Sequence, residues 1–311
     1  MIRVHNLTKR FGHLTAVDNL TFEVKEGEIF SLLGPNGAGK TTTISILATL
    51  LLPTSGEAWI DGYSILQRPL EVRRLIGVVP QEIALYQDLS GYENLWFWGQ
   101  MYGLRGAELR QRIRMTLEQV GLDEKAHHKV RTYSGGMKRR LNLAAGLLHH
   151  PRVLFLDEPT VGIDPQSRRA ILDFVKSLNR EGMTILYTTH YMEEAQELSH
   201  RVGIMDHGRL IALGTQSALL QQAGEHDTLV LSFENDLKPQ PPLEVLRHLS
   251  EVINVSREGD RIKVLTTAPE EVLPHLVTVC LEHGVRIRSV EVIEPNLETV
   301  FLKLTGRALR D

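Results

Sequence analysis

The strongest chemical signal in the sequence is a glycine-rich stretch between the apolar run 29–33 and a helix-compatible segment from Thr41 to Leu52. It fits the pattern G-x-x-x-x-G-K-[ST], in which glycines let the backbone curl so that several N–H groups converge on one phosphate. Unpaired N–H groups at the start of the following helix add to the positive field. The stretch predicts a polyphosphate-binding loop made of Gly34, Pro35, Asn36, Gly37, Ala38, Gly39, Lys40, Thr41 and Thr42.

Side chains inside and outside this loop complete a hydrolytic set. Lys40 supplies a mobile cation for the β- and γ-phosphates, and Thr41 offers a hydroxyl group to Mg²⁺. The continuous apolar run 153–157 is typical of a parallel strand buried on both faces; it ends in Asp157, and Glu158 follows. We expect Asp157 to orient the Mg²⁺ sphere and Glu158 to polarise the attacking water as a general base.

The elements that must position these residues alternate along the chain. Strands are expected at residues 1–7, 17–24, 29–33, 57–60, 75–79, 153–157 and 184–189, with a closing hairpin over 201–213. Helices are expected at 41–52, 134–148, 167–179 and 191–198, and a mainly helical lobe at about 82–148. This alternation predicts an α/β fold with a mainly parallel sheet, an antiparallel β subdomain and the phosphate loop at the carboxyl ends of the strands.

From about residue 224 the sequence has a different rhythm. An acidic, proline-rich loop is expected over 234–242. Around it the pattern predicts strand, helix, strand, strand, helix and strand, followed by a final helix. This order suggests a small α+β domain of the ferredoxin-like type.

Composition narrows the possible partners. The net charge of −3 gives no reason to expect nucleic-acid binding. Cys280 is the one cysteine, so no intrachain disulfide can form and a reducing compartment fits. The longest apolar run, 44–52, is far short of the ~20 residues that span a bilayer. Any membrane role is therefore expected to act through a partner.

Further motifs make the chain resemble the ATP-binding subunit of an ABC transporter. Tyr133-Ser-Gly-Gly-Met137 resembles the LSGGQ signature, and Gln81 follows an apolar strand as in the Q-loop. Gly162-Ile-Asp-Pro165 resembles the D-loop, and His190 resembles the switch histidine. These motifs run in the family's order over residues 1 to about 220.

The resemblance implies ATP and Mg²⁺ as cofactors. It implies that Gln81 lies near the metal with Thr41 and Asp157, and that Gln81 and His190 act with Glu158 in catalysis. The motif matches also place Asp164 at the nucleotide. Phe11 occupies the aromatic position that stacks on adenine, where tyrosine is commoner, and stacking requires only a π-face.

Two residues depart from the family's signature, because Tyr133 stands for leucine and Met137 for glutamine. Ser134, Gly135 and Gly136 are retained at the start of a helix whose N–H groups can meet a γ-phosphate. What Met137 removes is any side-chain hydrogen bond that a glutamine would make there.

The resemblance also implies an assembly. Two cassettes pair head to tail, each ATP lying between one P-loop and the other chain's Ser134-Gly-Gly136, so a homodimer or a paired ABC ATPase subunit is required. An integral membrane permease would hold the protein at the cytoplasmic face of the membrane. We assign residues 1–223 to the ATP-binding domain and 224–311 to a C-terminal accessory domain. The sequence around the motifs is similar to that of ATP-binding cassettes from bacterial ABC-2-type exporters of drugs and lipid-like compounds.

Three alternatives stay open. The aromatic cluster Trp96-Phe-Trp98 either lines a groove for a short permease helix or packs inside the helical lobe. The basic run Lys138-Arg-Arg140 is interpreted as a solvated face or a contact across the dimer. The whole chain could instead be a soluble ABC ATPase acting on a non-transport partner, or a regulatory module that binds nucleotide without turnover.

Overall fold

The computed structural model describes residues 1–222, 226–233, 243–258, 261–293 and 296–305. The contacts between residues divide the chain into two compact units, with the division between Gln216 and Ser217. This division lies before the domain boundary predicted after residue 223. The predicted proline-rich loop, 234–242, lies outside the described residues. In the described part of the chain, no helix is long and apolar enough to cross a membrane.

The first unit is built on a six-stranded sheet with the order β10-β9-β3-β8-β7-β6. The strands β6, β7, β8, β3 and β9 run parallel, and β10 closes the edge as an antiparallel hairpin with β9. Their bounds are β3 Ile29–Leu33, β6 Ile76–Val79, β7 Val153–Asp157, β8 Thr184–Thr189, β9 Arg201–Asp206 and β10 Arg209–Gly214.

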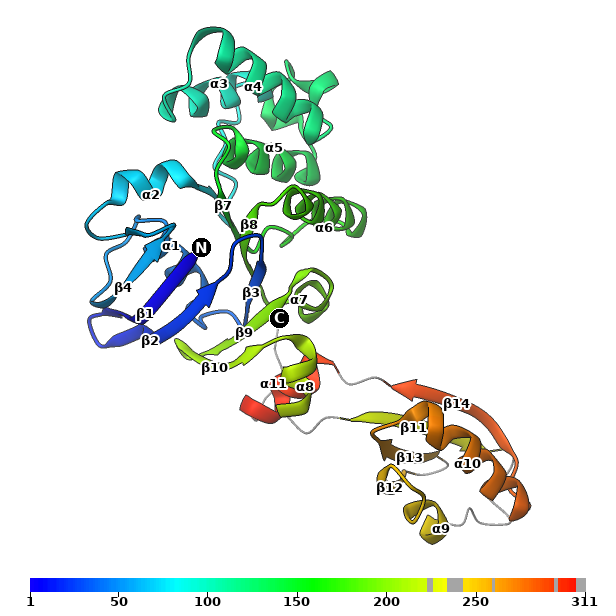
Figure 1. Cartoon of the computed structure of the whole chain (residues 1–311). Helices are drawn as coiled ribbons and strands as arrows, with labels where there is room; N and C mark the ends of the chain where they lie inside the picture. Colours follow the sequence, from blue (N-terminus) through cyan, green and yellow to red (C-terminus); the bar gives the residue numbers. More distant parts are fainter. Residues whose placement is uncertain (223–225, 234–242, 259–260, 294–295, 306–311) are drawn as a thin grey trace. The chain divides into compact units, whose positions relative to one another are not determined.

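Both faces of this sheet are covered, which explains the uninterrupted apolar runs in its central strands. On one face Phe155 belongs to a core with Ile44 and Leu47 of α1 (Lys40–Leu47). On the other face Leu154 packs in a core with Ile171 of α6 (Pro165–Arg180). Figure 1 shows these two helices on opposite sides of the sheet.

A second, antiparallel sheet has the order β2-β1-β4-β5, in which β1 spans Ile2–Phe11, β2 Leu14–Val24, β4 Ser55–Ile60 and β5 Tyr63–Ser64. The antiparallel subdomain is confirmed, but β1 and β2 are longer than predicted. Their pairing continues to the end of the hairpin, where Phe11 lies opposite Leu14. Cross-strand pairing therefore extends structure beyond the apolar alternation visible in the sequence.

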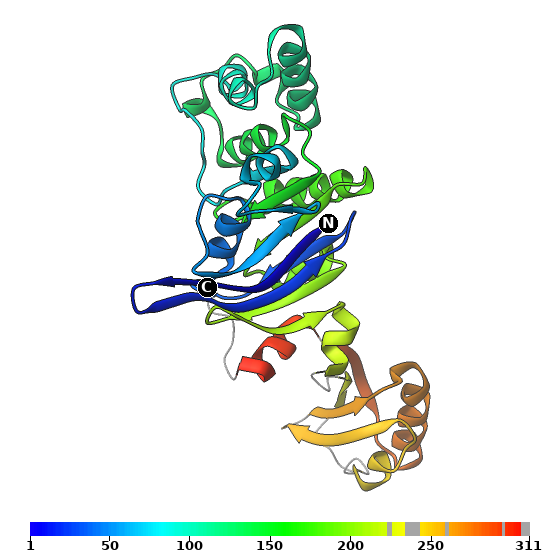
Figure 2. The same ribbon diagram turned by 60° about the vertical axis from the view of Figure 1, so that its left-hand side comes forward.

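The helical lobe consists of α3 (Gly91–Met101), α4 (Gly106–Gln119) and α5 (Gly135–Leu147), with short 3₁₀ turns at Asp123–Lys125 and Val130–Thr132. Figure 2 shows the lobe as a cluster of helices. One predicted helix, 41–52, and one predicted strand, 75–79, need correction. Helix α1 ends at Leu47, because Leu50 and Leu51 donate backward to the carbonyl of Ser45. Residues 69–75 form a helix, α2, which takes Leu75 from the predicted strand.

Helix α8 (Gln216–Gln222) starts at the division, and all of it but Gln216 belongs to the second unit. The unit also contains β11 (Asp227–Phe233), α9 (Leu243–Arg247), β12 (Val252–Glu258), β13 (Arg261–Thr266), α10 (Pro269–Glu282), β14 (Ile287–Ile293) and α11 (Leu297–Thr305). Its antiparallel sheet has the order β12-β13-β11-β14. Leu229 and Leu231 of the central strand share a core with Leu246 of α9 and Leu276 of α10. This is the ferredoxin-like arrangement that the element order suggested.

Candidate active site

The phosphate loop follows β3 at the carboxyl edge of the parallel sheet. Gly34 N donates to the carbonyl of Thr189 at the end of neighbouring strand β8, over 3.3 Å. Gly39 has φ 101°, and a Cβ atom on it would lie 2.4 Å from the carbonyl oxygen of Ala16. Only glycine fits this position, which turns the chain into α1 at Lys40.

Lys40 is a buried cation at the centre of the loop, only 4% exposed. Its Nζ donates to the carbonyls of Gly34 (2.7 Å) and Pro35 (3.0 Å) and pairs with Oε1 of Glu158 at 2.9 Å. A charge this deeply buried is stable only when it is paired and hydrogen-bonded. The contact joins two residues that the sequence placed far apart.

Asp157 ends β7 beside the first turn of α1. Its Oδ1 accepts from Thr41 Oγ1 at 3.2 Å and from Thr188 Oγ1 at 2.6 Å. Burial raises the pKa of Asp157, although these two hydrogen bonds oppose the shift. The predicted pair of Thr41 and Asp157 therefore comes together.

Oxygen atoms of this kind are the ligands that Mg²⁺ prefers. Gln81 follows strand β6, whose Val79 lies opposite Leu156 of β7, so its backbone reaches the same edge of the sheet. The described residues include no cluster of three or more histidine, cysteine or carboxylate side chains suited to a metal. Thr41 and Asp157 thus fit a Mg²⁺ ion that takes its remaining ligands from phosphates and water.

Glu158 and His190 are in direct contact. His190 Nδ1 lies 3.1 Å from Glu158 Oε2, while the other carboxylate oxygen faces Lys40. Glu158 adopts φ 45°, and its N–H lies 3.1 Å from the carbonyl and 3.0 Å from Oγ1 of Thr188. A left-handed conformation at a non-glycine residue is held by such surrounding contacts and is common at functional sites. It aims the carboxylate back across the phosphate loop.

A buried carboxylate behind the site is absent from the sequence-based predictions. Glu194 on α7 (Met192–Leu198) is 2% exposed. Its oxygens accept from Thr160 Oγ1 at 2.7 Å, Tyr187 Oη at 2.8 Å and Thr189 Oγ1 at 2.9 Å. The network braces the segments that follow Glu158 and precede His190. Nothing in the local pattern Glu193-Glu194 distinguishes the buried acid from its exposed neighbour.

The signature residues lie with the helical lobe. Ser134 caps α5, because its Oγ accepts from Met137 N at 3.2 Å. Gly136 lies against α6: a Cβ atom there would sit 2.0 Å from Oγ of Ser167, whereas nothing lies within 4 Å of a Cβ on Gly135. The side chain of Met137 packs against the apolar core of the lobe. The methionine therefore serves packing, and Ser134 and Gly135 remain exposed.

Two other predicted nucleotide contacts are also on the surface. Asp164 is the N-cap of α6, and its Oδ1 accepts from Ser167 N at 2.9 Å. Hydrogen bonds from Ser167 lower the pKa of Asp164. Phe11, at the end of β1, is 48% exposed, with Lys9 Nζ 5.0 Å from its ring centroid. An exposed aromatic face of this kind is available for stacking.

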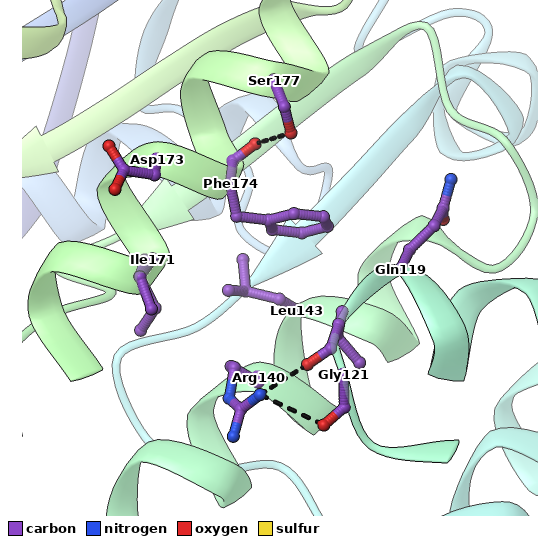
Figure 3. Close-up of a pocket in the computed structure, with 10 residues that line it drawn as sticks. Gln119, Gly121, Arg140, Leu143, Ile171, Asp173, Phe174 and Ser177 are labelled. Atoms are coloured by element: carbon purple, nitrogen blue, oxygen red, sulfur yellow. Dashed lines mark hydrogen bonds between the residues drawn. The ribbon is translucent and has the colours of Figure 1, made fainter. Parts of the chain in front are cut away.

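The basic run on α5 does not form one solvated face, and that prediction is wrong for Arg139, which is 4% exposed. Arg140 is half-buried, and its Nη1 donates to the carbonyls of Val120 (2.7 Å) and Gly121 (3.3 Å) at the end of α4. Figure 3 shows these bonds at the wall of a pocket between α4, α5 and α6. Arg140 therefore satisfies the last carbonyls of a helix.

An apolar cavity of about 530 Å³ opens beside the Gln81 loop. Its walls include Pro80 and Ala84 from this loop, Leu50 after α1, and Trp98 and Met101 of α3. Leu50 and Met101 are 70% and 68% exposed. Trp96 takes a different position, because its ring stacks on Tyr92 with centroids 6.0 Å apart. Both tryptophans pack against the apolar core of the lobe, and of the two only Trp98 also lines the cavity.

A phosphate loop at the carboxyl edge of a mainly parallel sheet, facing an acid pair at the end of a strand two positions away in that sheet, defines a P-loop NTPase. Comparison with known proteins narrows the class. Residues 17–161 match the family model described as "ABC transporter". The chain is 46% identical to the linearmycin resistance ATP-binding protein LnrL of Bacillus subtilis (strain 168), over 100% of both chains.

Other relatives agree. The Nod factor export ATP-binding protein I of Cupriavidus metallidurans is 40% identical, over 100% of this chain and 99% of its own. The doxorubicin resistance ATP-binding protein DrrA of Mycobacterium tuberculosis (strain H37Rv) is 40% identical, over 94% and 89%. Among solved structures, a dimeric ATP-binding cassette in a post-hydrolysis state with ADP and phosphate matches with a TM-score of 0.63 and 30% identity, over 69% of this chain and 98% of its own.

The chain belongs to the ATP-binding cassette proteins of ABC transporters, and it is an ATPase. The predicted family and fold class are confirmed.

Proposed function

We propose that two copies of this chain, or one copy and a paired ABC ATPase subunit, close head to tail around two ATP molecules and drive a membrane permease. The proposal is supported by the division of the site. Lys40, Asp157, Glu158 and His190 are packed together, whereas Ser134 and Gly135 are exposed on a separate helical lobe. A second chain would bring exposed signature N–H groups to the γ-phosphate.

The chemistry proposed for the site is in-line attack of water on the γ-phosphorus. Glu158 accepts the proton from water as the new P–O bond forms, and the bridging P–O bond breaks to release ADP. His190 holds the Glu158 carboxylate from one side and Lys40 from the other, over 3.1 and 2.9 Å. Such fixed partners orient the base before the reaction begins.

Thr41, Asp157 and Gln81 are the residues that would hold Mg²⁺. When bound, this ion neutralises charge on the phosphate oxygens. Phe11 would stack on the adenine, and Asp164 would lie at the face completed by the second chain.

The permease is proposed to dock a short helix in the apolar cavity beside the Gln81 loop, and thereby to hold the cassette at the cytoplasmic face of the membrane. Exposed Leu50 and Met101 with Trp98 offer an apolar surface that a helix can cover. Because the cavity lies beside the loop that carries Gln81, a helix docked there would be linked through this loop to the ATP site. The names of the relatives favour export of a drug-like or lipid-like compound as the work performed.

Trp98→Ala tests this assignment, with Trp96→Ala as the matched control on the same helix. Each tagged variant would be purified from detergent-solubilised membranes of cells that express it together with a candidate membrane permease. We expect Trp98→Ala to lose most of the co-purified membrane protein and Trp96→Ala to keep it. Equal recovery with both variants would remove the cavity as the docking site. A co-purified partner without membrane spans would favour the soluble, non-transport alternative.

A further inference from the structure

Arg139 is a buried cation whose hydrogen-bond partners are backbone carbonyls. Its Nη1 donates to Pro80 O at 3.2 Å and Gln81 O at 2.8 Å, and its Nη2 donates to Val161 O at 3.4 Å. Its Nε has no hydrogen-bond partner. Among the residues that the structure describes, no carboxylate forms an ion pair with it.

Burying a guanidinium in this way is costly. Burial lowers the pKa of Arg139, and the negative charge of Asp157 opposes the shift. The group nevertheless stays protonated, as arginine does throughout proteins. The cost of placing Arg139 at this point therefore calls for a positional explanation.

The three segments joined by Arg139 each carry a residue of the site. The side chain comes from α5, which begins at the signature residues Ser134 and Gly135. Two of its bonds hold the loop with Gln81, and the third holds Val161, between Glu158 and Asp164. The planar fork of arginine fixes the relative directions of its donors. A displacement of α5 would thus move both loops together.

We propose that Arg139 is a positioning residue for hydrolysis. It ties the helix that would meet the ATP of the second chain to the Gln81 and Asp164 loops of its own chain, so that each ATP site responds to the other. The inference rests on the proposed head-to-tail dimer and adds to it a named connection between the two sites.

Arg140 provides a matched control on the same helix. It also donates to two carbonyls, but these belong to Val120 and Gly121 at the end of α4, away from the site loops. Replacing either arginine with glutamine removes a cation and leaves carbonyls unpaired. Only Arg139 contacts loops of the ATP site, so the two variants separate positioning from stability.

The test uses the full-length protein and compares Arg139→Gln, Arg139→Lys and Arg140→Gln for kcat with MgATP, affinity for ADP, and melting temperature. We expect Arg139→Gln to lower kcat at least about tenfold, since ~1 Å of misplacement costs up to about 10²-fold. ADP affinity should stay within about twofold, because the P-loop is untouched. Arg139→Lys keeps the charge without the fork and should recover only part of kcat. It also carries the test if the glutamine variant fails to fold.

Arg140→Gln should lose melting temperature while keeping kcat within about threefold. If Arg139→Gln keeps its kcat, or if both variants lose kcat in proportion to their melting temperatures, Arg139 is only structural and the inference is wrong.

Sedimentation with MgATP separates this inference from the dimer itself. Glu158→Gln should dimerise, and adding Arg139→Gln should leave that dimer intact, because Ser134 to Gly136 are unchanged. A monomeric Glu158→Gln would contradict the proposed pairing of two copies. Loss of the dimer only when Arg139→Gln is added would show that Arg139 shapes the signature surface instead, and would overturn the inference.

Discussion

The two sets of residues that we propose to contact the nucleotide differ in how they are held within the first unit. Lys40, Asp157 and Glu158 are 4%, 3% and 4% exposed. Lys40 and Glu158 form an ion pair, and Asp157 accepts hydrogen bonds from two threonine hydroxyls. The signature residues Ser134 and Gly135 are exposed at the start of α5. The side chains of the first set are therefore already in contact within one chain, whereas the second set forms a surface that a ligand could still contact.

Under the proposed function, the buried set would carry out hydrolysis, and the exposed set would make hydrolysis depend on a second chain. The residues that we propose to activate water are preorganised within one chain, which would lower the cost of aligning them during the reaction. The N–H groups of the signature helix are shaped by the same chain but offered outward. Hydrolysis would then depend on the pairing of two chains, which brings the buried set of one chain to the exposed set of the other. ATP itself is the ligand that both sets would bind.

His190→Ala should disrupt the contacts of the buried set and lower turnover more than the Gly135 and Phe11 variants described below. It removes one of the two partners of the Glu158 carboxylate, so we expect turnover to fall about 10²-fold or more. ATP affinity should be kept because the P-loop is unchanged. Steady-state ATPase and nucleotide-binding assays measure the two quantities.

The control is His200→Ala, since His200 Nδ1 accepts from Ile29 N in the core at 3.0 Å. It should alter stability more than turnover. An unchanged rate in His190→Ala would make that histidine only structural.

Gly135→Ala addresses the exposed set. The new methyl group meets no atom within 4 Å in the single chain, so the melting temperature should hold or rise. The methyl group would occupy the space of an approaching phosphate, and we expect kcat to fall roughly tenfold. Thermal melting and ATPase rates on one preparation test both statements.

Gly136→Ala is the contrasting variant, because its methyl group would lie 2.0 Å from Ser167 Oγ. It should destabilise the protein by about 1–3 kcal/mol through overpacking. If Gly135→Ala hydrolyses ATP at the normal rate, the exposed signature has no part in the site.

Phe11 should give the smallest effect. Phe11→Ala removes an exposed ring, so folding should be unaffected, while loss of stacking should raise KM for ATP roughly fivefold (about 1 kcal/mol). Phe11→Tyr keeps the π-face and should behave like the parent. Equal KM values for all three proteins would show that adenine does not stack there.

The sequence predicted the sheet edge well because buried parallel strands are continuous apolar runs. The runs ending at Leu33 and Asp157 place the phosphate loop and the acid pair at the same edge of the sheet, on either side of β8, as expected from parallel topology. The βαββαβ order of the second unit was also visible. Local pattern and tertiary structure agree at these places.

What sequence reasoning missed depends on contacts between distant residues. Thr188 and Glu194 bind groups far along the chain, and Arg139 is buried although it stands in a basic run. Helical spacing alone did not separate Arg139 from the half-buried Arg140. Only the packing of α5 against the Gln81 and Val161 loops distinguishes them.

The central claim is that one chain holds an incomplete ATP site that a second cassette completes, in the simplest case a second copy of this chain. Sedimentation of purified Glu158→Gln with MgATP tests it most directly, because glutamine preserves the shape of Glu158 but cannot accept the proton from water. We predict a stable dimer with ATP, a monomer with ADP, and almost no hydrolysis. A Glu158→Gln protein that stays monomeric at saturating MgATP and hydrolyses it at the parent rate would contradict the account.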